Sequence, residues 1–355
     1  MSVGRDMATA TLLLDGGVLI AGGEGYDAGR SAELYDPKTG TFSRTGSPAV
    51  SLFSATATLL LDGRVLIEGG FEFANEDNWA QTASAELYDP KTGTFSRTGS
   101  LPEPRVSYTA ALLKDGRVLI AGGETSSEGL GTATALLYDP ATGEFSPTGS
   151  MEHARVDHTA TLLQDGRVLI AGGIGDHSAE VYDPATGTFS ATGMMNLVDE
   201  DHVATLLSDG RDLVAGDGEK GGVTYPVAEL YDPQRGTFAT TGSMVNECNC
   251  TGWTGSPVSA PLLADGRALV PDWRPEASGN WIGSAELYDP FTGSFSEAGP
   301  MSRLRSGFTD TLLADGRVLF AGDMGVMLAG GAPTLTPKEA AANAVGRASA
   351  ELWVP

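Results

Sequence analysis

The chain of 355 residues is short of basic residues, of cysteine and of long apolar runs. Its 22 lysines and arginines face 46 aspartates and glutamates, and the net charge is −24. This balance argues against nucleic acid and anionic membrane surfaces as partners, and it favours cations or simply solubility. No stretch approaches the ~18 consecutive apolar residues that a membrane span needs. The two cysteines, Cys248 and Cys250, do not make a disulfide framework.

A secretory signal is also lacking, because Met1 to Arg5 leads directly into the first repeat described below. We therefore expect a cytoplasmic protein, or a secreted one if the chain is a truncated form of a longer product. The composition does not change along the chain, which predicts a single domain over residues 1–355.

One unit recurs along the whole chain, and its cleanest copy runs over residues 155–193. Two apolar runs surround Asp165-Gly166, which predicts a β-hairpin because a type I′ turn needs two residues with positive φ. A third strand ends at Tyr182, a turn with the sequence Asp-Pro-Ala-Thr-Gly follows, and Phe189 opens a fourth strand. An antiparallel meander of roughly 50 residues has the size of one propeller blade.

The Asp-Gly turn occurs seven times, and the tyrosine of the third strand occurs six times with Trp353 in the seventh place. Since the chain ends inside the third strand of the last copy, we expect a three-stranded last blade. Its exposed edge would favour a homodimer. We expect the blades to begin near residues 5, 52, 105, 155, 199, 255 and 305.

The chain resembles the kelch-repeat family over essentially its whole length. The resemblance rests on Arg155-x-x-His158 before the first strand, Gly172-Gly173 after the second and Tyr-Asp-Pro after the third. It implies an all-β fold: a seven-bladed kelch-type β-propeller of four-stranded antiparallel blades. It does not imply one function, since kelch propellers include oxidases of the galactose oxidase type, sialic acid mutarotases and many binding modules. It also implies that the arginine of the motif lies at the mouth of the propeller, as a ligand-binding candidate, in four copies: Arg5, Arg105, Arg155 and Arg305.

Variation between copies gathers in the loops on the face opposite the Asp-Gly turns, so we expect recognition there. The longest insertion covers residues 324–347, where Thr336-Pro337-Lys338-Glu339 predicts the start of a short helix. Tryptophans in such loops suit stacking on a sugar, an aromatic ring or a peptide side chain, or they pack the loops themselves. Four tryptophans fall in these loops: Trp79, Trp253, Trp273 and Trp281.

Histidine and aspartate supply the candidate catalytic and metal-binding groups. His158 and His202 follow Asp157 and Asp201 at equivalent positions of neighbouring blades, and Tyr108 takes the place of the histidine in the third copy. Imidazole with carboxylate suits a divalent transition metal or a general acid–base pair. The alternative is that these histidines pack against the adjacent blade.

A second set of acids replaces the second glycine of the Gly-Gly pair in three successive blades. Their carboxylates would converge on a cation or a polar ligand, or aspartate merely adopts the backbone conformation of glycine there. Cys248-x-Cys250 is a weaker signal, for a soft metal, a strained disulfide or free thiols. The three acids are Asp217, Asp272 and Asp323.

Two functions remain open, and the sequence does not decide whether the protein is an enzyme. The first is a recognition propeller that binds a small molecule, glycan or peptide at its variable mouth. The second is a hydrolase of esters, lactones or phosphotriesters, in which zinc, manganese, iron or calcium lowers the pKa of a bound water. A copper-radical oxidase like galactose oxidase is disfavoured. Those enzymes take a copper ligand from a separate C-terminal domain, and the sequence has no convincing Cys–Tyr pair.

Overall fold

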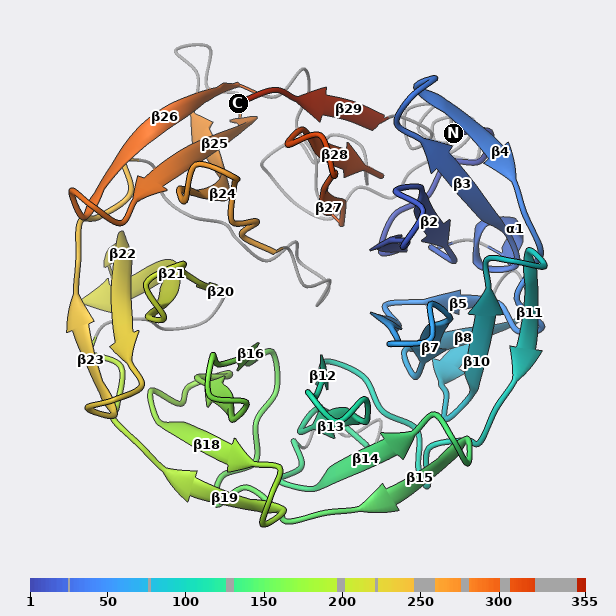
Figure 1. Cartoon of the computed structure of the whole chain (residues 1–355), viewed down its shortest axis with the longest axis horizontal. Helices are drawn as coiled ribbons and strands as arrows, with labels where there is room; N and C mark the ends of the chain where they lie inside the picture. The colour runs from blue at the N-terminus through green and yellow to red at the C-terminus, as the bar shows by residue number, and fades with distance from the viewer. Residues whose placement is uncertain are drawn as a thin grey trace.

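The computed structural model describes residues 1–24, 26–75, 78–125, 131–196, 202–220, 223–245, 259–275, 281–300, 307–322 and 350–355. In these ranges seven of the eight β-sheets each contain one copy of the repeat, and they stand around a common axis (Figure 1). The first and last copies lie side by side, since β1 (Thr9–Leu12) contacts β27 (Thr309–Leu312). The predicted all-β propeller fold is therefore confirmed.

Within each sheet the strands follow chain order from the axis outward, as an antiparallel meander does. The innermost strands are β1, β6 (Thr56–Leu59), β12 (Thr109–Leu112), β16 (Thr159–Leu162), β20 (Val203–Leu206) and β27. The second strands are β2 (Val18–Ala21), β7 (Val65–Glu68), β13 (Val118–Ala121), β17 (Val168–Ala171), β21 (Asp212–Lys220), β24 (Ala268–Pro275) and β28 (Val318–Ala321).

The outer two positions complete the sheets. The third strands are β3 (Ala32–Asp36), β10 (Ala85–Asp89), β14 (Ala135–Asp139), β18 (Ala179–Asp183), β22 (Val223–Asp232), β25 (Trp281–Asp289) and β29 (Ala350–Trp353). The fourth strands are β4 (Thr41–Arg44), β11 (Thr94–Arg97), β15 (Glu144–Pro147), β19 (Thr188–Ala191), β23 (Thr237–Thr240) and β26 (Ser294–Pro300).

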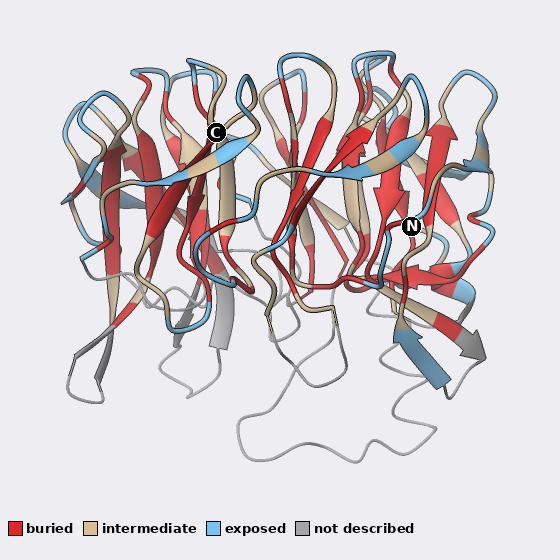
Figure 2. Cartoon of the chain, turned by 90° about the horizontal axis from the view of Figure 1, so that it is seen from below, coloured by how far each residue is buried: buried red, intermediate tan, exposed pale blue. Residues whose placement is uncertain are grey.

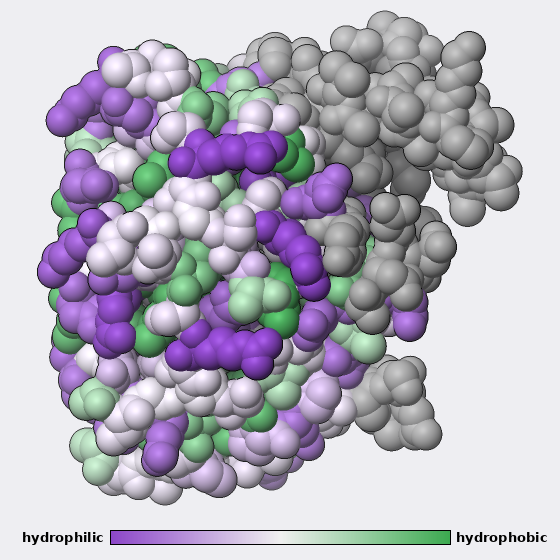
Figure 3. All heavy atoms as spheres, turned by 90° about the vertical axis from the view of Figure 1, so that its right-hand side faces the viewer, coloured by the Kyte–Doolittle hydropathy of each residue, from purple (hydrophilic) through white to green (hydrophobic). Residues whose placement is uncertain are grey.

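The hydrophobic core lies between neighbouring blades. All four residues of β17 are buried, and their side chains pack into the clusters on both sides. The fourth strands face solvent instead, with exposed residues along β4 and β11. On the outer wall over these strands hydrophilic residues are scattered among neutral and apolar ones (Figure 3). This gradient from the second strand to the fourth explains the apolar runs and polar ends of each repeat.

The constant spacing of tyrosine and phenylalanine within the repeat determines contacts inside blades and between them. Tyr182 lies opposite Phe189 across β18 and β19, and the ring centroids are 4.8 Å apart. The hydroxyl of Tyr182 is 2.9 Å from that of Thr148 in the preceding blade. In the last copy Trp353 makes the corresponding contact, because its Nε1 donates to the carbonyl of Ala298 at 3.2 Å.

The glutamate of the third strand explains part of the negative charge. Glu180 is buried and accepts the N–H of Glu152 at 2.9 Å in the connection between two blades. Glu86 accepts the N–H of Ala49 in the same way at 3.0 Å, and Glu229 accepts that of Asn196 at 2.9 Å. These acids therefore satisfy backbone donors of the scaffold.

Two of the seven sheets that contain a copy of the repeat have three strands within the described ranges. The last sheet, β27-β28-β29, lacks a fourth strand there, as expected. The sixth sheet departs from the four-stranded prediction: its innermost segment is reduced to a bridge between Leu262 and Ala268. Pro261 accepts a bond from the N–H of Leu269 but has no N–H to return one, so the ladder stops.

The variable loops add regular structure to some blades. An eighth sheet joins β5 (Leu52–Phe53), β8 (Phe71–Asn75) and β9 (Asn78–Gln81), and α1 (Tyr26–Gly29) is a single helical turn. Among the described helices none is long and apolar enough to cross a membrane. The insertion expected at residues 324–347, with its helix, lies outside the described ranges.

Candidate functional site

The two faces of the ring differ as the repeat predicts. Short exposed turns lie along one face, and the β8–β9 hairpin projects from the other (Figure 2). The first is called the turn face here and carries the Asp-Gly and Tyr-Asp-Pro turns. The second is the variable face, where recognition was expected.

The candidate histidines lie between blades. Both His158 and His202 are buried. His158 Nε2 is 2.9 Å from the hydroxyl of Thr109, and His202 Nε2 is 3.1 Å from the carbonyl oxygen of Ala171, each in the preceding blade. The imidazole rings pack on the first glycine of the Gly-Gly pair in the preceding blade. A Cβ added at Gly122 would lie 2.6 Å from Cε1 of His158. The pairing of histidine with glycine is thus a packing contact.

The environment keeps His158 neutral. Burial, followed by the charges of Arg155 and His202, lowers its pKa to about 3. A neutral imidazole can ligate a metal, but Nε2 of His158 is engaged by the hydroxyl of Thr109. Tyr108 occupies the equivalent position in the third copy, and its hydroxyl donates to the carbonyl of Glu68 at 2.6 Å.

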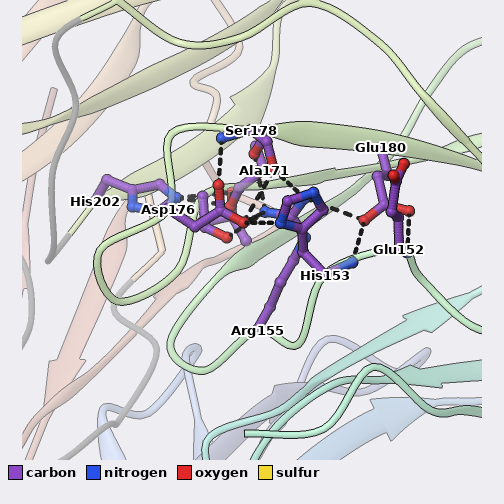
Figure 4. Close-up of polar contacts among 10 residues, drawn as sticks. Glu152, His153, Arg155, Ala171, Asp176, Ser178, Glu180 and His202 are labelled. Carbon is purple, nitrogen blue, oxygen red and sulfur yellow. Dashed lines mark hydrogen bonds and ion pairs between the residues drawn. The ribbon is translucent and has the colours of Figure 1, made fainter.

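The motif arginines are buried inside their own blades. Arg155 Nη1 donates to the carbonyls of Gly172 at 2.8 Å and Ser178 at 2.9 Å. Its guanidinium also pairs with Asp176 at 3.2 Å and Glu180 at 3.1 Å (Figure 4). Each described arginine therefore fastens the end of the second strand to the start of the third. Arg5 and Arg105 make the corresponding bonds to Gly22 at 2.7 Å and Gly122 at 2.6 Å.

Asp157 has a backbone role. Its φ is 53°, and its N–H donates to the carbonyl of Ser107 at 3.2 Å in the preceding blade. Aspartate tolerates this left-handed conformation better than most residues. The equivalent residue has positive φ in four further copies: Met7, Ser54, Ser107 and Gly307.

The described acids of the variable face do not form a metal centre. Asp217 is half-buried in β21 opposite Pro226, and Asp272 is buried in β24 with a hydrogen bond from the hydroxyl of Ser284. Within the described ranges no three His, Cys, Asp or Glu residues are placed to hold a metal ion. Several candidates lie outside those ranges: Asp201, Asp323, Arg305, Trp253, Cys248 and Cys250.

Trp79 belongs to an aromatic patch on the variable face, made of Phe53, Phe71, Phe73 and Trp79. The ring of Phe53 lies 5.1 Å from that of Phe71 and 4.7 Å from that of Phe73. Trp79 meets the ring of Phe71 edge-on at 4.9 Å, and the tryptophan remains 55% exposed. The backbones of Trp273 and Trp281 belong to the β24–β25 hairpin, away from this patch in the chain.

The central channel contains a carboxylate that sequence reasoning missed. A cavity of about 370 Å³ is lined mainly by alanines and threonines of the innermost strands, and Asp310 projects into it. Its two oxygens accept the N–H of Ser259 at 2.9 Å and the hydroxyl of Ser259 at 2.7 Å. Desolvation raises the pKa of Asp310 to about 6. The available signal was that the other six copies have alanine at this position.

Comparisons with known proteins define the fold. No family model matches the chain, and no curated protein matches it. A fungal alcohol oxidase of the AA5 family, solved in complex with copper, is similar with a TM-score of 0.71 and 18% identity, over 92% of this chain and 71% of the oxidase. The protein YjhT is similar with a TM-score of 0.62 and 14% identity, over 83% of this chain and 97% of YjhT. These likenesses support the kelch and galactose oxidase type of propeller fold, and nothing finer.

Proposed function

We propose that the chain is a recognition propeller that binds a glycan or a peptide on its variable face, with Trp79 as the main contact residue. The observation that carries this proposal is the aromatic patch. Trp79 is largely exposed, but Phe71 and Phe53 support it from behind. A rigid aromatic surface of this kind is typical of binding hot spots.

The charge of the protein narrows the ligand class. With a net charge of −24, the chain repels anionic ligands at low salt, so a neutral or cationic glycan or peptide is favoured. A pyranose ring or an apolar peptide side chain would cover the exposed part of the indole. Covering roughly 100 Å² of apolar surface contributes about 2.5 kcal/mol.

The test compares two exposed aromatic residues on opposite faces. Wild type, Trp79→Ala and Phe291→Ala would be screened on glycan and peptide arrays, and the dissociation constants of the hits measured by calorimetry. Phe291 is 97% exposed in the turn between β25 and β26 on the turn face, which makes it a matched control. Trp79→Ala should weaken binding about 10- to 100-fold, while Phe291→Ala should leave it unchanged. Equal affinity of Trp79→Ala and wild type would refute the proposal.

The metal-dependent hydrolase stays a prediction. His158 and His202 have interblade contacts, and two of its acids, Asp201 and Asp323, lie outside the described ranges. Because the similar fungal oxidase is described with copper, copper belongs beside zinc, manganese, iron and calcium in any metal analysis.

A further inference from the structure

The Asp-Gly turns carry a second residue with a repeated role. In six of the seven copies an arginine follows the glycine. Its Nε donates to Oδ2 of the turn aspartate, at 2.8 Å for Arg64 on Asp62 and for Arg167 on Asp165. The guanidinium and the carboxylate thus form a hydrogen-bonded ion pair within the turn. The six arginines are Arg64, Arg117, Arg167, Arg211, Arg267 and Arg317.

The same guanidinium connects neighbouring blades. Arg64 Nη2 donates to the carbonyl of Pro140 at 3.3 Å, in the Tyr-Asp-Pro turn of the next blade. Arg167 donates to Pro233 at 3.3 Å, and Arg317 to Pro37 at 2.9 Å. The turn face therefore has a recurring guanidinium site, formed by the turn aspartate of one blade and the proline carbonyl of the next.

The first copy lacks this arginine, because Gly17 stands in its place. Asp15 Oδ1 accepts the N–H of Gly17 at 2.9 Å. Where the guanidinium would lie, the structure has a pocket of about 400 Å³ lined by Asp15 and Pro90, the equivalents of the two groups that hold it elsewhere. Leu13 and Leu14 also line this pocket and offer an apolar wall for a methylene chain.

The charges around the pocket favour a cation. Asp62 and Asp89 add their carboxylates to that of Asp15, while Arg64 is paired with Asp62 and Lys91 lies exposed at the edge. Burial raises the pKa of Tyr138 and of Tyr88. The charge of Arg64 opposes this rise at Tyr138, whereas the charges of Asp15 and Asp89 add to it at Tyr88. The first interblade junction thus lacks the turn arginine that lies near the tyrosine of the next one.

We propose that the pocket at Asp15 and Pro90 binds a guanidinium group from a ligand, in the place that the turn arginine fills in the other copies. The ligand is a small guanidinium compound or an arginine side chain of a peptide. A planar fork of N–H donors matches a carboxylate and a carbonyl better than an ammonium does. The site lies on the turn face, so it is independent of the function proposed for the variable face.

The experiment is an amide NMR titration with Nα-acetyl-arginine amide, read at Gly17 and Gly63. Saturable shifts are expected for wild type, with Nα-acetyl-lysine amide binding about ten-fold more weakly. Methylguanidine and a peptide with one arginine distinguish the sources. Equal affinity of the two indicates a small guanidinium compound, and about ten-fold tighter binding of the peptide indicates an arginine side chain.

Two variants provide matched controls. Gly17→Arg should fill the pocket and abolish the shifts, and it should fold because a Cβ at Gly17 meets only contacts of 3.3 Å and 3.5 Å. Arg117→Gly should open an equivalent site beside Asp115 and add a second set of shifts. The proposal is overturned by absent shifts in wild type, by shifts that persist in Gly17→Arg, by equal binding of the lysine amide, or by a folded Arg117→Gly without a new site.

Discussion

Replacing Glu68 by alanine is expected to stabilise the protein at neutral and alkaline pH. Glu68 is fully buried at the end of β7, and neither carboxyl oxygen is in hydrogen-bonding geometry with a described partner. Burial raises its pKa from 4.5 to about 8, and the hydroxyl of Thr56 offsets the rise only in part. Five other copies have alanine at this position: Ala21, Ala121, Ala171, Ala215 and Ala321.

The magnitude follows from proton linkage. The folded protein keeps the proton of Glu68 up to a pH of about 8, whereas the unfolded chain releases it above 4.5. The stability that depends on this proton is present in full below pH 4.5 and is lost as the pH rises toward 8. At 1.36 kcal/mol per pH unit, the loss is about 3 kcal/mol at pH 7 and about 5 kcal/mol at pH 9.

Urea unfolding at pH 5, 7 and 9 measures this effect. The advantage of Glu68→Ala over wild type should grow by about 4 kcal/mol between pH 5 and pH 9, because the folded wild type keeps a proton that its unfolded chain releases. Glu68→Gln keeps the volume without a titrating group, so its advantage should rise with the same slope. A stability difference that does not change with pH in either variant would refute the reasoning.

Three further predictions concern other parts of the ring. Asp212→Val should stabilise the protein by about 4 kcal/mol at pH 8 and by much less at pH 4 in urea unfolding, because burial raises the pKa of Asp212 from 3.8 to about 7. His158→Ala should lower stability by about 2 kcal/mol, through loss of packing on Gly122, and should leave the content of bound metal unchanged when measured by plasma mass spectrometry. A fall in metal content would instead support the hydrolase. The outer edge of β29, whose described ladder is with β28, predicts a homodimer in light scattering, and a monomer at high concentration would contradict this.

The local elements of the fold follow from the sequence because their signals are short-range. Asp165-Gly166 and the turn after Tyr182 determine where strands end, and these turns recur at fixed spacing. The register of Tyr182 opposite Phe189 follows from the length of that turn. The reduction of the innermost strand of the sixth sheet to a bridge also has a local cause, in Pro261.

The roles of the candidate residues were less accessible. The sequence singled out Arg155 and His158, and it offered interblade packing as one explanation of the histidine. Their burial and partners, such as Thr109 and Ser178, appear only in the structure. The residue type shows that a side chain can bind a ligand or a metal, but the hydrogen bonds already made by that side chain depend on the neighbouring blade.

The tertiary structure alone decided the contacts between residues that are distant in the chain. Tertiary packing brings Phe53 against Trp79, places Asp310 in the central cavity, and sets Asp15 of the first blade beside Pro90 of the second. The sequence by itself determined the repeat, because each blade folds through its own turns and alternating strands. The pocket at Asp15 lies between two blades, the cavity at Asp310 lies among the innermost strands, and the aromatic patch lies on the loops of one blade. Their chemistry depends on which copies depart from the repeat and on which neighbours those copies meet.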